Sequence, residues 1–374
     1  MIVTDRGITS LHLTDPLQES LEAAGIAFTV FDETCANPTI SNVEAAKDAY
    51  LAFGGETFIA FGGGSAMDCA KAAAARIAKP GQSVEKMEGL LKIRRKLPLL
   101  IAVPTTAGTG SETTLAAVIT DDKTHHKYPI NDFALIPRYA LLDYHTTLGL
   151  PKNLTATTGM DAMTHAVEAY IGRSTTKYTR AMAEEAVTLI NTHLPRAYAD
   201  GSDTTAREKM LRASYCAGNA FTRSYVGYVH GVAHSLGGMY GVPHGLANAV
   251  ILPHFLDEYG STAWKRLGRL ARNTGIADTA DSDEIASKKF IARIKELNGM
   301  MEIPEHLDGI REKDIPLLAS YADKESNPLY PVPKLMDAKE LEKMYYVVAG
   351  DKLIRSWAAA ANTQGEKNGH NKYT

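Results

Sequence analysis

The sequence predicts an α/β domain with a parallel sheet, followed by an all-helical domain. Short apolar runs alternate with helical segments up to about residue 150, and strand signals nearly vanish after it. The 374 residues exceed the usual size of one hydrophobic core, so two domains are the default. We place them at 1–150 and 151–361, with a polar tail at 362–374 that we expect to be disordered.

The elements of the first domain alternate in the order that crossover connections require. Apolar runs predict strands at 1–3, 27–31, 57–61 and 99–103, and helical spacing predicts helices at 15–24, 43–53 and 66–78. In the second domain, helical spacing predicts successive helices at 153–172, 177–199, 206–225, 228–240, 262–274, 281–299 and 337–361.

The composition excludes several classes of protein. The chain is 45% hydrophobic and 22% charged with a formal net charge of -3, so no nucleic-acid partner is indicated. Three scattered cysteines favour a reducing compartment over a disulfide framework. No apolar run approaches a membrane span and no signal-peptide core is present, so we expect a cytoplasmic protein without a membrane partner.

A strand-to-helix turn contains Gly62, Gly63 and Gly64, followed by Ser65. Glycines let the backbone approach a phosphate closely, and the free N–H groups at a helix N-terminus bind anions. We expect Ser65 to cap the helix, with Asp68 as its capping-box partner. A tight turn without a ligand is the alternative, since the segment is not a GxGxxG fingerprint.

A second polar loop, with Thr105 and Thr106, follows the next strand, where ligands of open α/β sheets bind. Asp5 ends the first strand. A carboxylate there would accept bonds from a ribose 2′-hydroxyl and repel a 2′-phosphate, which favours NAD over NADP. The alternative for a lone Asp after a strand is an ordinary turn residue.

Four possible metal ligands stand in the second domain: Asp161, His165, His230 and His244. Asp161 and His165 are four residues apart and therefore share one helix face. Glu168 continues this polar stripe, and no Lys or Arg lies between residues 153 and 172, which argues against a plain solvated face. A buried Asp and His need partners, and a metal supplies one.

The second ligand segment is rich in glycine and histidine. Its glycines, at 227, 231, 237, 238 and 241, would allow close helix approach and would weaken a helix built only for stability. Three imidazoles and one carboxylate suit Fe²⁺ or Zn²⁺, whereas any single histidine could be a satisfied core residue. His234 is left over, for proton relay near a substrate or for orienting a ligand.

Together these segments resemble the iron-containing (group III) alcohol dehydrogenase family. The resemblance runs from residue 1 to about residue 348 and rests on GGGSAMDCAK (62–71), PTTAGTGSE (104–112), GMDAMTHAVEAY (159–170), GYVHGVAH (227–234) and PHGLANA (243–249). It implies an NAD(P)-dependent alcohol or aldehyde oxidoreductase, usually with Fe²⁺ and sometimes with another divalent ion. The metal ligands would be Asp161, His165, His230 and His244.

The resemblance also implies roles in cofactor binding. The turn at 62–65 would hold the pyrophosphate, and Thr105 and Thr106 would lie at the nicotinamide end. Asn37 and Lys127 match cofactor-contacting positions, and Asp5 falls where the family distinguishes NAD from NADP.

The chain departs from the family pattern at two places. The family normally opens with a strand, a hairpin and a helix ahead of the strand in which this chain begins, at Met1. We expect a misplaced start or a truncated gene, and a homodimer would then lack the hairpin contact. Ala66 stands where many relatives carry Pro, a change that is harmless in a first helical turn.

We therefore expect a metal-dependent NAD(P) oxidoreductase that interconverts a small primary alcohol or diol and its aldehyde by hydride transfer. The metal would act as a Lewis acid on the substrate oxygen, with His234 as the proton carrier. One alternative is a metal- and NAD-dependent lyase of dehydroquinate-synthase type, although only Arg173 and Arg223 lie near the metal motifs. A truncated, inactive family member is the other. Four aromatic residues could line a substrate pocket or belong to the core: Phe221, Tyr225, Tyr240 and Phe255.

Overall fold

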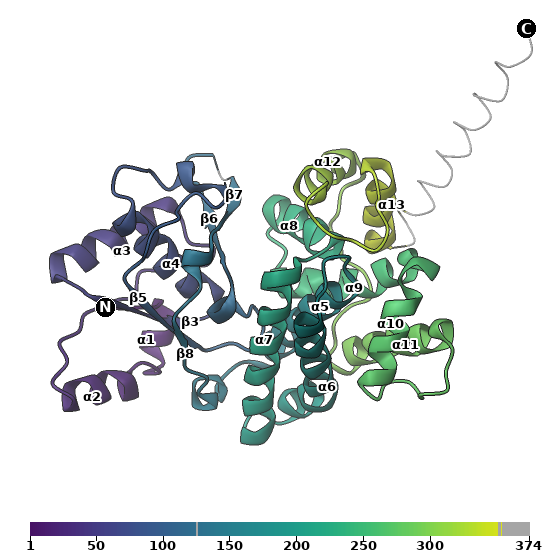
Figure 1. The fold of residues 1–374 in the computed structure, drawn as a ribbon, viewed down its shortest axis with the longest axis horizontal. Helices are drawn as coiled ribbons and strands as arrows, with labels where there is room; N and C mark the ends of the chain where they lie inside the picture. The colour runs from purple at the N-terminus through teal and green to yellow at the C-terminus, as the bar shows by residue number, and fades with distance from the viewer. Residues whose placement is uncertain (125, 351–352, 354–374) are drawn as a thin grey trace, which may run out of the picture. The chain divides into compact units, whose positions relative to one another are not determined.

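The computed structural model describes residues 1–124, 126–350 and 353, which form two compact units (Figure 1). The first comprises Met1–Ala166 and Glu185–Arg223, and the second comprises Val167–Glu184 and the chain from Ser224 onward. Every strand of the described chain precedes residue 141, and only helices follow, so the predicted fold class is confirmed. The tail expected at 362–374 and the end of the helix expected at 337–361 lie outside the described residues.

A five-stranded parallel sheet forms the centre of the first unit, in the order β2-β1-β3-β5-β8. The strands are β1 (Ile2–Val3), β2 (Val30–Phe31), β3 (Thr57–Gly62), β5 (Leu99–Pro104) and β8 (Tyr139–Ala140). The strand order reverses between β1 and β3, because β2 lies on one side of β1 and all later strands lie on the other. Ligands of open α/β sheets bind beyond the carboxyl ends of the strands at such a switch point.

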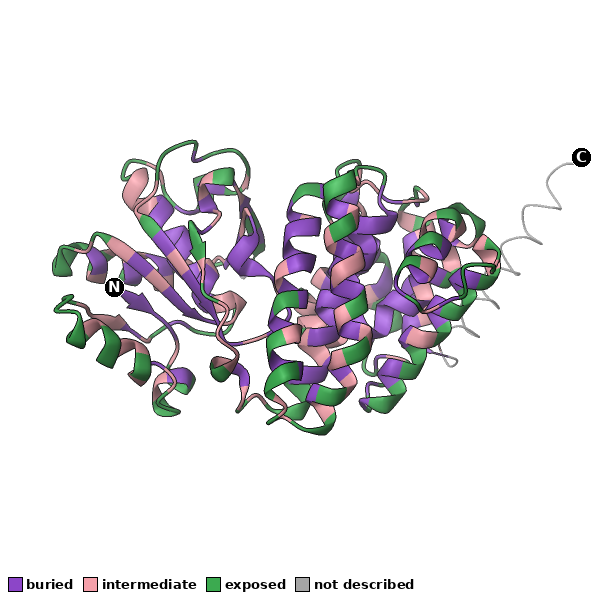
Figure 2. Cartoon of the chain, turned by 60° about the horizontal axis from the view of Figure 1, so that its bottom comes forward, coloured by how far each residue is buried: buried purple, intermediate pink, exposed green. Residues whose placement is uncertain are grey.

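Helices cover both faces of this sheet (Figures 1 and 2). On one face, α3 (Ile40–Phe53) and the alanine-rich α4 (Gly64–Ala78) share a buried core with Val3 and Phe58. On the other face, α1 (Arg6–Ser10) and α2 (Asp15–Ala23) shelter Ile2 and Phe61. Neighbouring strand residues point to opposite faces, so Ile2 and Val3 enter different cores.

A second, three-stranded sheet adjoins these elements in sequence and was not predicted. It has the order β4-β7-β6, with β4 (Gly89–Leu90), β6 (Ala116–Thr120) and β7 (Lys127–Asn131). β7 alternates exposed and buried residues over only five positions and contains Pro129, so its sequence signal is weak. Four short 3₁₀ helices complete this part of the chain: η1 (Glu85–Met87), η2 (Ser111–Thr113), η3 (Phe133–Leu135) and η4 (Tyr144–Thr147).

Helices follow, and most of them are long and lie near the predicted positions. They are α5 (Lys152–Ile171), α6 (Lys177–Ala199), α7 (Thr204–Ser224), α8 (Tyr228–Tyr240), α9 (His244–Tyr259), α10 (Ser261–Asn273), α11 (Asp283–Met300), η5 (Glu312–Asp314), α12 (Ile315–Ser326) and α13 (Ala338–Ala349). Helices α9 and α12 were not predicted. In α9, seven consecutive residues from Ala247 to Pro253 are buried, so no one-sided apolar pattern marks the helix. None of the helices in the described residues is both long and apolar enough to cross a membrane.

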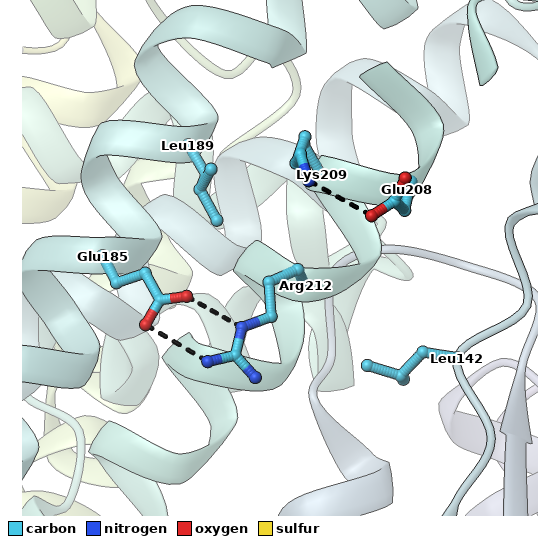
Figure 3. A pocket seen from close by; sticks show the side chains of 6 residues that line it. All are labelled: Leu142, Glu185, Leu189, Glu208, Lys209 and Arg212. Atoms are coloured by element: carbon cyan, nitrogen blue, oxygen red, sulfur yellow. Dashed lines mark hydrogen bonds and ion pairs between the residues drawn. The ribbon is translucent and has the colours of Figure 1, made fainter. Parts of the chain in front are cut away.

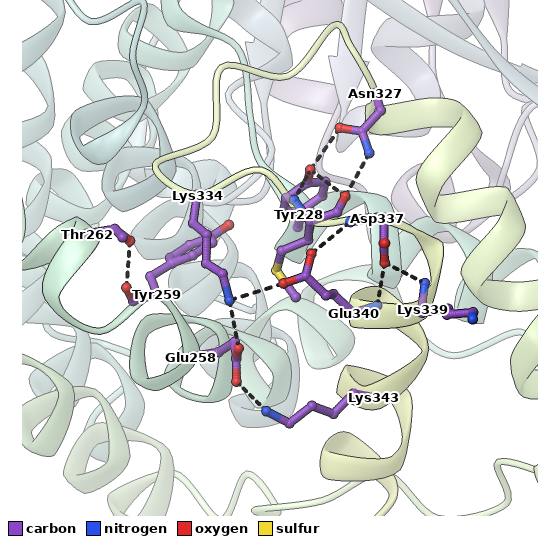
Figure 4. A network of polar contacts seen from close by, with 11 residues as sticks. Tyr228, Glu258, Tyr259, Thr262, Asn327, Lys334, Asp337, Lys339, Glu340 and Lys343 are labelled. Atoms are coloured by element: carbon purple, nitrogen blue, oxygen red, sulfur yellow. Dashed lines mark hydrogen bonds and ion pairs between the residues drawn. The ribbon is translucent and has the colours of Figure 1, made fainter. Parts of the chain in front are cut away.

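A polar network ties the end of the second unit together (Figure 4). The Glu258 carboxylate of α9 accepts hydrogen bonds from Lys334 (3.0 Å) and Lys343 (2.8 Å). Tyr228, the first residue of α8, donates its hydroxyl to Asn327 Oδ1 at 2.8 Å and accepts from the backbone N–H of Met336 at 3.0 Å. The loop between α12 and α13 is thereby attached to the N-terminus of α8.

Candidate metal centre and cofactor site

The glycine turn connects β3 to α4 and can be built only with glycine at its first position. Gly62 has a φ of +156°, and a Cβ there would lie 2.7 Å from Ala66 Cβ and 3.2 Å from Ile8 Cδ1. Gly63 is the N-cap residue of α4 and, being glycine, has no side chain to cap the N–H groups of the first turn. A helix N-terminus without a capping side chain is suited to bind an anionic group.

The expected capping box of Ser65 and Asp68 is wrong, because α4 begins one residue before Ser65. Ser65 Oγ instead accepts a hydrogen bond from the backbone N–H of Asn37 at 3.3 Å. Asp68 accepts from Ser111 Oγ with one carboxylate oxygen and from the backbone N–H of Val118 with the other, both at 3.0 Å. Asp68 therefore joins α4 to η2 and β6.

Lys71 is a fully buried residue whose role the sequence did not reveal. Its ammonium lies 2.6–3.0 Å from five oxygens, which belong to Ser111, Thr114 and Ala116. Burial lowers the pKa of Lys71 to about 8 and raises the pKa of nearby Glu112 to about 7. The ammonium thus holds together the polar loop that follows β5, a loop which also carries Thr105 and Thr106.

The structure brings together several of the predicted cofactor residues. Asn37, with a φ of +58°, joins Ser65 through its N–H and accepts from Lys127 Nζ through its side-chain oxygen at 2.7 Å. Asn37 and Lys127 are both exposed to solvent. A Cβ at Gly63 would lie 3.5 Å from Thr106 Oγ1, so the glycine turn and the threonine loop are neighbours.

Two more of the predicted cofactor residues, Asp5 and Thr105, follow strands β1 and β5 of the parallel sheet. Asp5 Oδ1 accepts the N–H of Ile8 at 3.1 Å and caps α1, a helix that the sequence did not predict. Thr105 is buried, and its N–H donates to Gly62 O at 3.0 Å, which extends the β3–β5 pairing. The groups that follow β1, β3 and β5 thus gather at the carboxyl ends of three adjacent strands.

The four predicted metal ligands converge. Asp161, His165, His230 and His244 each offer one ligand atom, and these atoms all lie within 4.8 Å of one another. All but His244 are buried. His165 Nε2 lies 3.9 Å from Asp161 Oδ1, and the His165 ring stacks on Phe221 with 4.1 Å between ring centroids. Of the four aromatic candidates, Phe221 therefore lies against a predicted ligand, whereas Phe255 is fully buried core.

The imidazole of His230 is oriented by Glu168. The distance from His230 Nδ1 to Glu168 Oε2 is 2.6 Å, and the same carboxylate accepts the N–H groups of Gly227 (2.8 Å) and Val229 (2.9 Å) at the start of α8. Because a carboxylate only accepts, the proton of a neutral His230 sits on Nδ1, and Nε2 is the nitrogen that can serve as a metal ligand. A Cβ at Gly227 would lie 2.5 Å from Glu168 Oε1, which explains the glycine.

Asn248 of α9 contacts two of the four predicted metal ligands. Its side-chain nitrogen lies 3.1 Å from the Nε2 atoms of both His230 and His244. An amide N–H₂ donates, so Asn248 is a common hydrogen-bond partner of the two Nε2 atoms in this structure. Three imidazoles and one carboxylate, mostly buried and with their ligand atoms within 4.8 Å of one another, fit Fe²⁺ or Zn²⁺.

His234 is separate from the four ligands but lies beside them. Its ring stacks on that of His244, with 5.1 Å between centroids and 18° between planes. Its Nδ1 lies 2.6 Å from Glu325 Oε1, which also accepts the hydroxyl of Tyr330 at 2.7 Å. Burial acts to raise the pKa of Glu325, but the charge and hydrogen bond of His234, together with the hydrogen bond of Tyr330 and the charge of His244, lower that pKa below its ordinary value.

A polar hollow elsewhere in the described chain, lined by Leu142, Glu185, Leu189, Glu208, Lys209 and Arg212, contains none of the predicted site residues (Figure 3). Its charges already bind one another, Arg212 to Glu185 at 2.8 Å and Lys209 to Glu208 at 3.1 Å. The arginines nearest the metal motifs are engaged as well, Arg173 with Pro333 O and Arg223 with Asn219 Oδ1.

Comparison with known proteins gives the family. Residues 1–144 match the family described as iron-containing alcohol dehydrogenase, and residues 155–348 match the C-terminal domain of the Fe-containing alcohol dehydrogenase family. The chain belongs to the iron-containing alcohol dehydrogenase family.

Individual relatives agree with this assignment. The chain is 40% identical to alcohol dehydrogenase 4 of Saccharomyces cerevisiae over 326 residues, which cover 86% of this chain and 84% of that one. Its fold matches a crystal structure of 1,3-propanediol oxidoreductase with a TM-score of 0.89 at 36% identity, covering 93% of this chain and 91% of the other. A sulfoacetaldehyde reductase from Bifidobacterium kashiwanohense, solved with NAD⁺, matches with a TM-score of 0.82 at 30% identity, covering 93% and 90%.

The class of protein predicted from the sequence is therefore confirmed. The chain is an oxidoreductase of the alcohol dehydrogenase or aldehyde reductase type, with the Asp/His metal cluster of an iron-containing enzyme.

Proposed function

We propose that this enzyme interconverts a small primary alcohol or diol and its aldehyde, with NAD as the hydride carrier and Fe²⁺ as the resident metal. The observation that carries the proposal is the convergence of Asp161, His165, His230 and His244 within 4.8 Å. Relatives of the chain include an alcohol dehydrogenase and a 1,3-propanediol oxidoreductase, which supports short alcohols and diols as the substrate class.

The metal would be held by Asp161, His165, His230 and His244. When bound, such an ion supplies Lewis acidity that favours negative charge on a substrate oxygen. Glu168, through its contact with Nδ1, would leave Nε2 as the nitrogen with which His230 holds the ion. Phe221, stacked on His165, offers an apolar face to a small carbon chain.

His234 is the residue that we assign to proton transfer. Its Nδ1 is engaged by Glu325, so Nε2 is the atom left to exchange a proton with the substrate hydroxyl, directly or through water. The assignment is supported by its stacking on His244, which places the ring beside a predicted ligand.

For the cofactor, the glycine turn at 62–65 would hold the pyrophosphate, because the first turn of α4 has no capping side chain. Asn37 and Lys127 would contact the dinucleotide, and Thr105 and Thr106 would lie toward the nicotinamide. Asp5 follows β1 next to the strand-order reversal, where a carboxylate favours the ribose hydroxyls of NAD over the phosphate of NADP.

The test is reconstitution of metal-free protein with Fe²⁺ and Zn²⁺ in parallel, followed by NADH absorbance with a panel of C2–C4 alcohols, diols, hydroxyaldehydes and their aldehydes. We expect Fe²⁺ to support activity, and His244→Ala to lose most bound metal and at least about 100-fold in kcat/KM. Full metal content and full activity in His244→Ala would overturn the ligand assignment.

The same preparation distinguishes the alternative functions. Phosphate release from a phosphorylated carboxylate substrate without net NADH formation would indicate the lyase. No change in NADH fluorescence at millimolar cofactor would indicate an inactive family member. We also propose that the enzyme is a homodimer located in the cytoplasm. Light scattering of the purified enzyme tests the first, and cell fractionation tests the second.

A further inference from the structure

A carboxylate that lies outside the metal cluster, Glu325, is bonded to the histidine beside that cluster. Glu325 is the next-to-last residue of α12, and its Oε1 lies 2.6 Å from His234 Nδ1 on α8. The two residues are 91 positions apart in sequence. His234 and Glu325 are each about one-third exposed at the side chain, so both can be reached by a small molecule.

The surroundings hold this carboxylate in one orientation. Tyr330 donates its hydroxyl to the same Oε1 at 2.7 Å, from the loop that follows α12. Ser326, the neighbour of Glu325, faces α8 closely, since a Cβ at Gly231 would lie 2.3 Å from Ser326 Oγ. The loop is attached to α8 a second time through the bonds of Tyr228 to Asn327 and Met336 (Figure 4).

The consequence of this geometry is a fixed tautomer. A free neutral histidine can carry its proton on either ring nitrogen, and only the hydrogen bonds around it decide which. An ionised carboxylate can only accept, so a neutral His234 carries its proton on Nδ1 and presents an unprotonated Nε2. A parallel relationship exists in the same unit, where Glu168 fixes His230 through Nδ1 at 2.6 Å.

We infer that Glu325 is the positioning residue of the reaction: it holds His234 as the Nδ1–H tautomer, with Nε2 ready to accept the proton of the substrate hydroxyl during alcohol oxidation. In the reverse direction the protonated imidazole returns the proton from Nε2 to the alkoxide oxygen. No atom of Glu325 is transferred, and Tyr330 restricts the carboxylate to the rotamer that serves His234. The inference rests on the proton-transfer role proposed above for His234.

The test compares Glu325→Ala, Glu325→Gln, His234→Ala and the double variant Glu325→Ala/His234→Ala. The tautomer is read directly, by two-bond ¹H–¹⁵N correlation spectra of histidine-labelled, Zn²⁺-loaded protein, with the His234 signals assigned by their loss in His234→Ala. We expect the Nδ1–H pattern in the wild type and in Glu325→Gln, because the amide oxygen still accepts. In Glu325→Ala we expect a shift toward the Nε2–H form.

If Glu325 fixes the tautomer of His234, its replacement should also change the kinetics. Glu325→Ala should lower kcat about 10- to 100-fold with unchanged metal content, and Glu325→Gln should recover most of that loss. The double variant should be no slower than His234→Ala, because Glu325 acts only through His234. Asp323→Asn is the control, since Asp323 lies on the same helix end and bonds Asn327 but not His234.

Each result has a defined meaning. An unchanged His234 tautomer in Glu325→Ala, or additive losses in the double variant, would overturn the inference. If His234→Ala keeps its full kcat, the proton-transfer proposal fails, and with it the kinetic part of this one. The spectra would then still report whether Glu325 fixes the ring. The retention of the Nδ1–H signal in Asp323→Asn is required, and its loss there would show that the end of α12 as a whole, rather than Glu325, is responsible.

Discussion

Glu168 and His230 are joined by a 2.6 Å contact between Oε2 and Nδ1, and both side chains are almost completely buried. The same carboxylate accepts two backbone N–H groups at the start of α8. One side chain on α5 therefore caps the helix that carries His230 and sets the direction of the His230 lone pair.

Replacing Glu168 with Gln should weaken metal binding about 10- to 100-fold. The glutamine amide has a single oxygen for the three donors, which are His230 Nδ1 and the N–H groups of Gly227 and Val229. Its N–H₂ group would then face one of these N–H groups without forming a hydrogen bond. Competition titration with a chromogenic chelator measures the metal affinity. Glu258→Gln is the matched control, because that carboxylate binds Lys334 and Lys343 and no ligand. Equal affinities in Glu168→Gln and wild type would contradict the orienting role.

Replacing Gly62 with Ala should lower NADH affinity at least about 10-fold and destabilise the protein by about 1–3 kcal/mol. The new Cβ would meet Ala66 Cβ at 2.7 Å in a backbone conformation with φ +156°. Fluorescence titration with NADH and urea unfolding measure the two effects. Gly81→Ala serves as control, since its Cβ would meet nothing within 4 Å and its φ is not strained. A Gly62→Ala protein with normal NADH affinity would remove the turn from the cofactor site.

Glu112 should make the folded state less stable as the pH rises from about 4.5 to 7. Burial raises its pKa from 4.5 to about 7, so over this range the folded protein holds a proton that the unfolded chain has lost. The penalty is absent below pH 4.5 and complete above about pH 7, where it reaches about 3 kcal/mol at most. Glu112→Gln should remove this slope in urea unfolding measured between pH 4.5 and 7.5.

Glu44 provides a control of opposite sign for that experiment. Burial acts to raise its pKa, but hydrogen bonds and charge from Arg76 and Lys47 lower it overall, so its stabilisation is lost as the pH falls. Glu44→Gln should therefore flatten the acid side of the stability curve. The Glu112 assignment is wrong if Glu112→Gln and wild type show parallel curves across the whole range.

Replacing Asp5 with Asn should raise the ratio of NADP to NAD activity about 10-fold. The substitution removes the charge that would repel a 2′-phosphate, yet an amide oxygen can still accept the N–H of Ile8 and cap α1. kcat/KM with each cofactor gives the ratio, and thermal unfolding checks that the cap survives. An unchanged ratio would leave Asp5 as a helix cap only.

Much of the fold was predictable because its signals are local. Alternating strand and helix patterns predicted the parallel sheet, and residues at helical spacing predicted α5 and α8. By contrast, α9 is buried on all sides along Ala247–Pro253, so no apolar stripe distinguishes it. The capping box was mispredicted for a related reason: the sequence motif was present, but α4 starts at Gly64 and gives Ser65 and Asp68 to longer-range partners.

The sequence by itself singled out the four candidate metal ligands and the glycine turn, because residue type and spacing of three or four positions are sufficient to define a helix face or a turn. Only the tertiary structure decided the partners that orient those groups. Glu168 meets His230 across 62 residues, Glu325 meets His234 across 91, and Lys71 finds its oxygens 40 to 45 residues away. Such contacts depend on how separate elements pack, and the local sequence around Glu325 or Lys71 does not predict that packing.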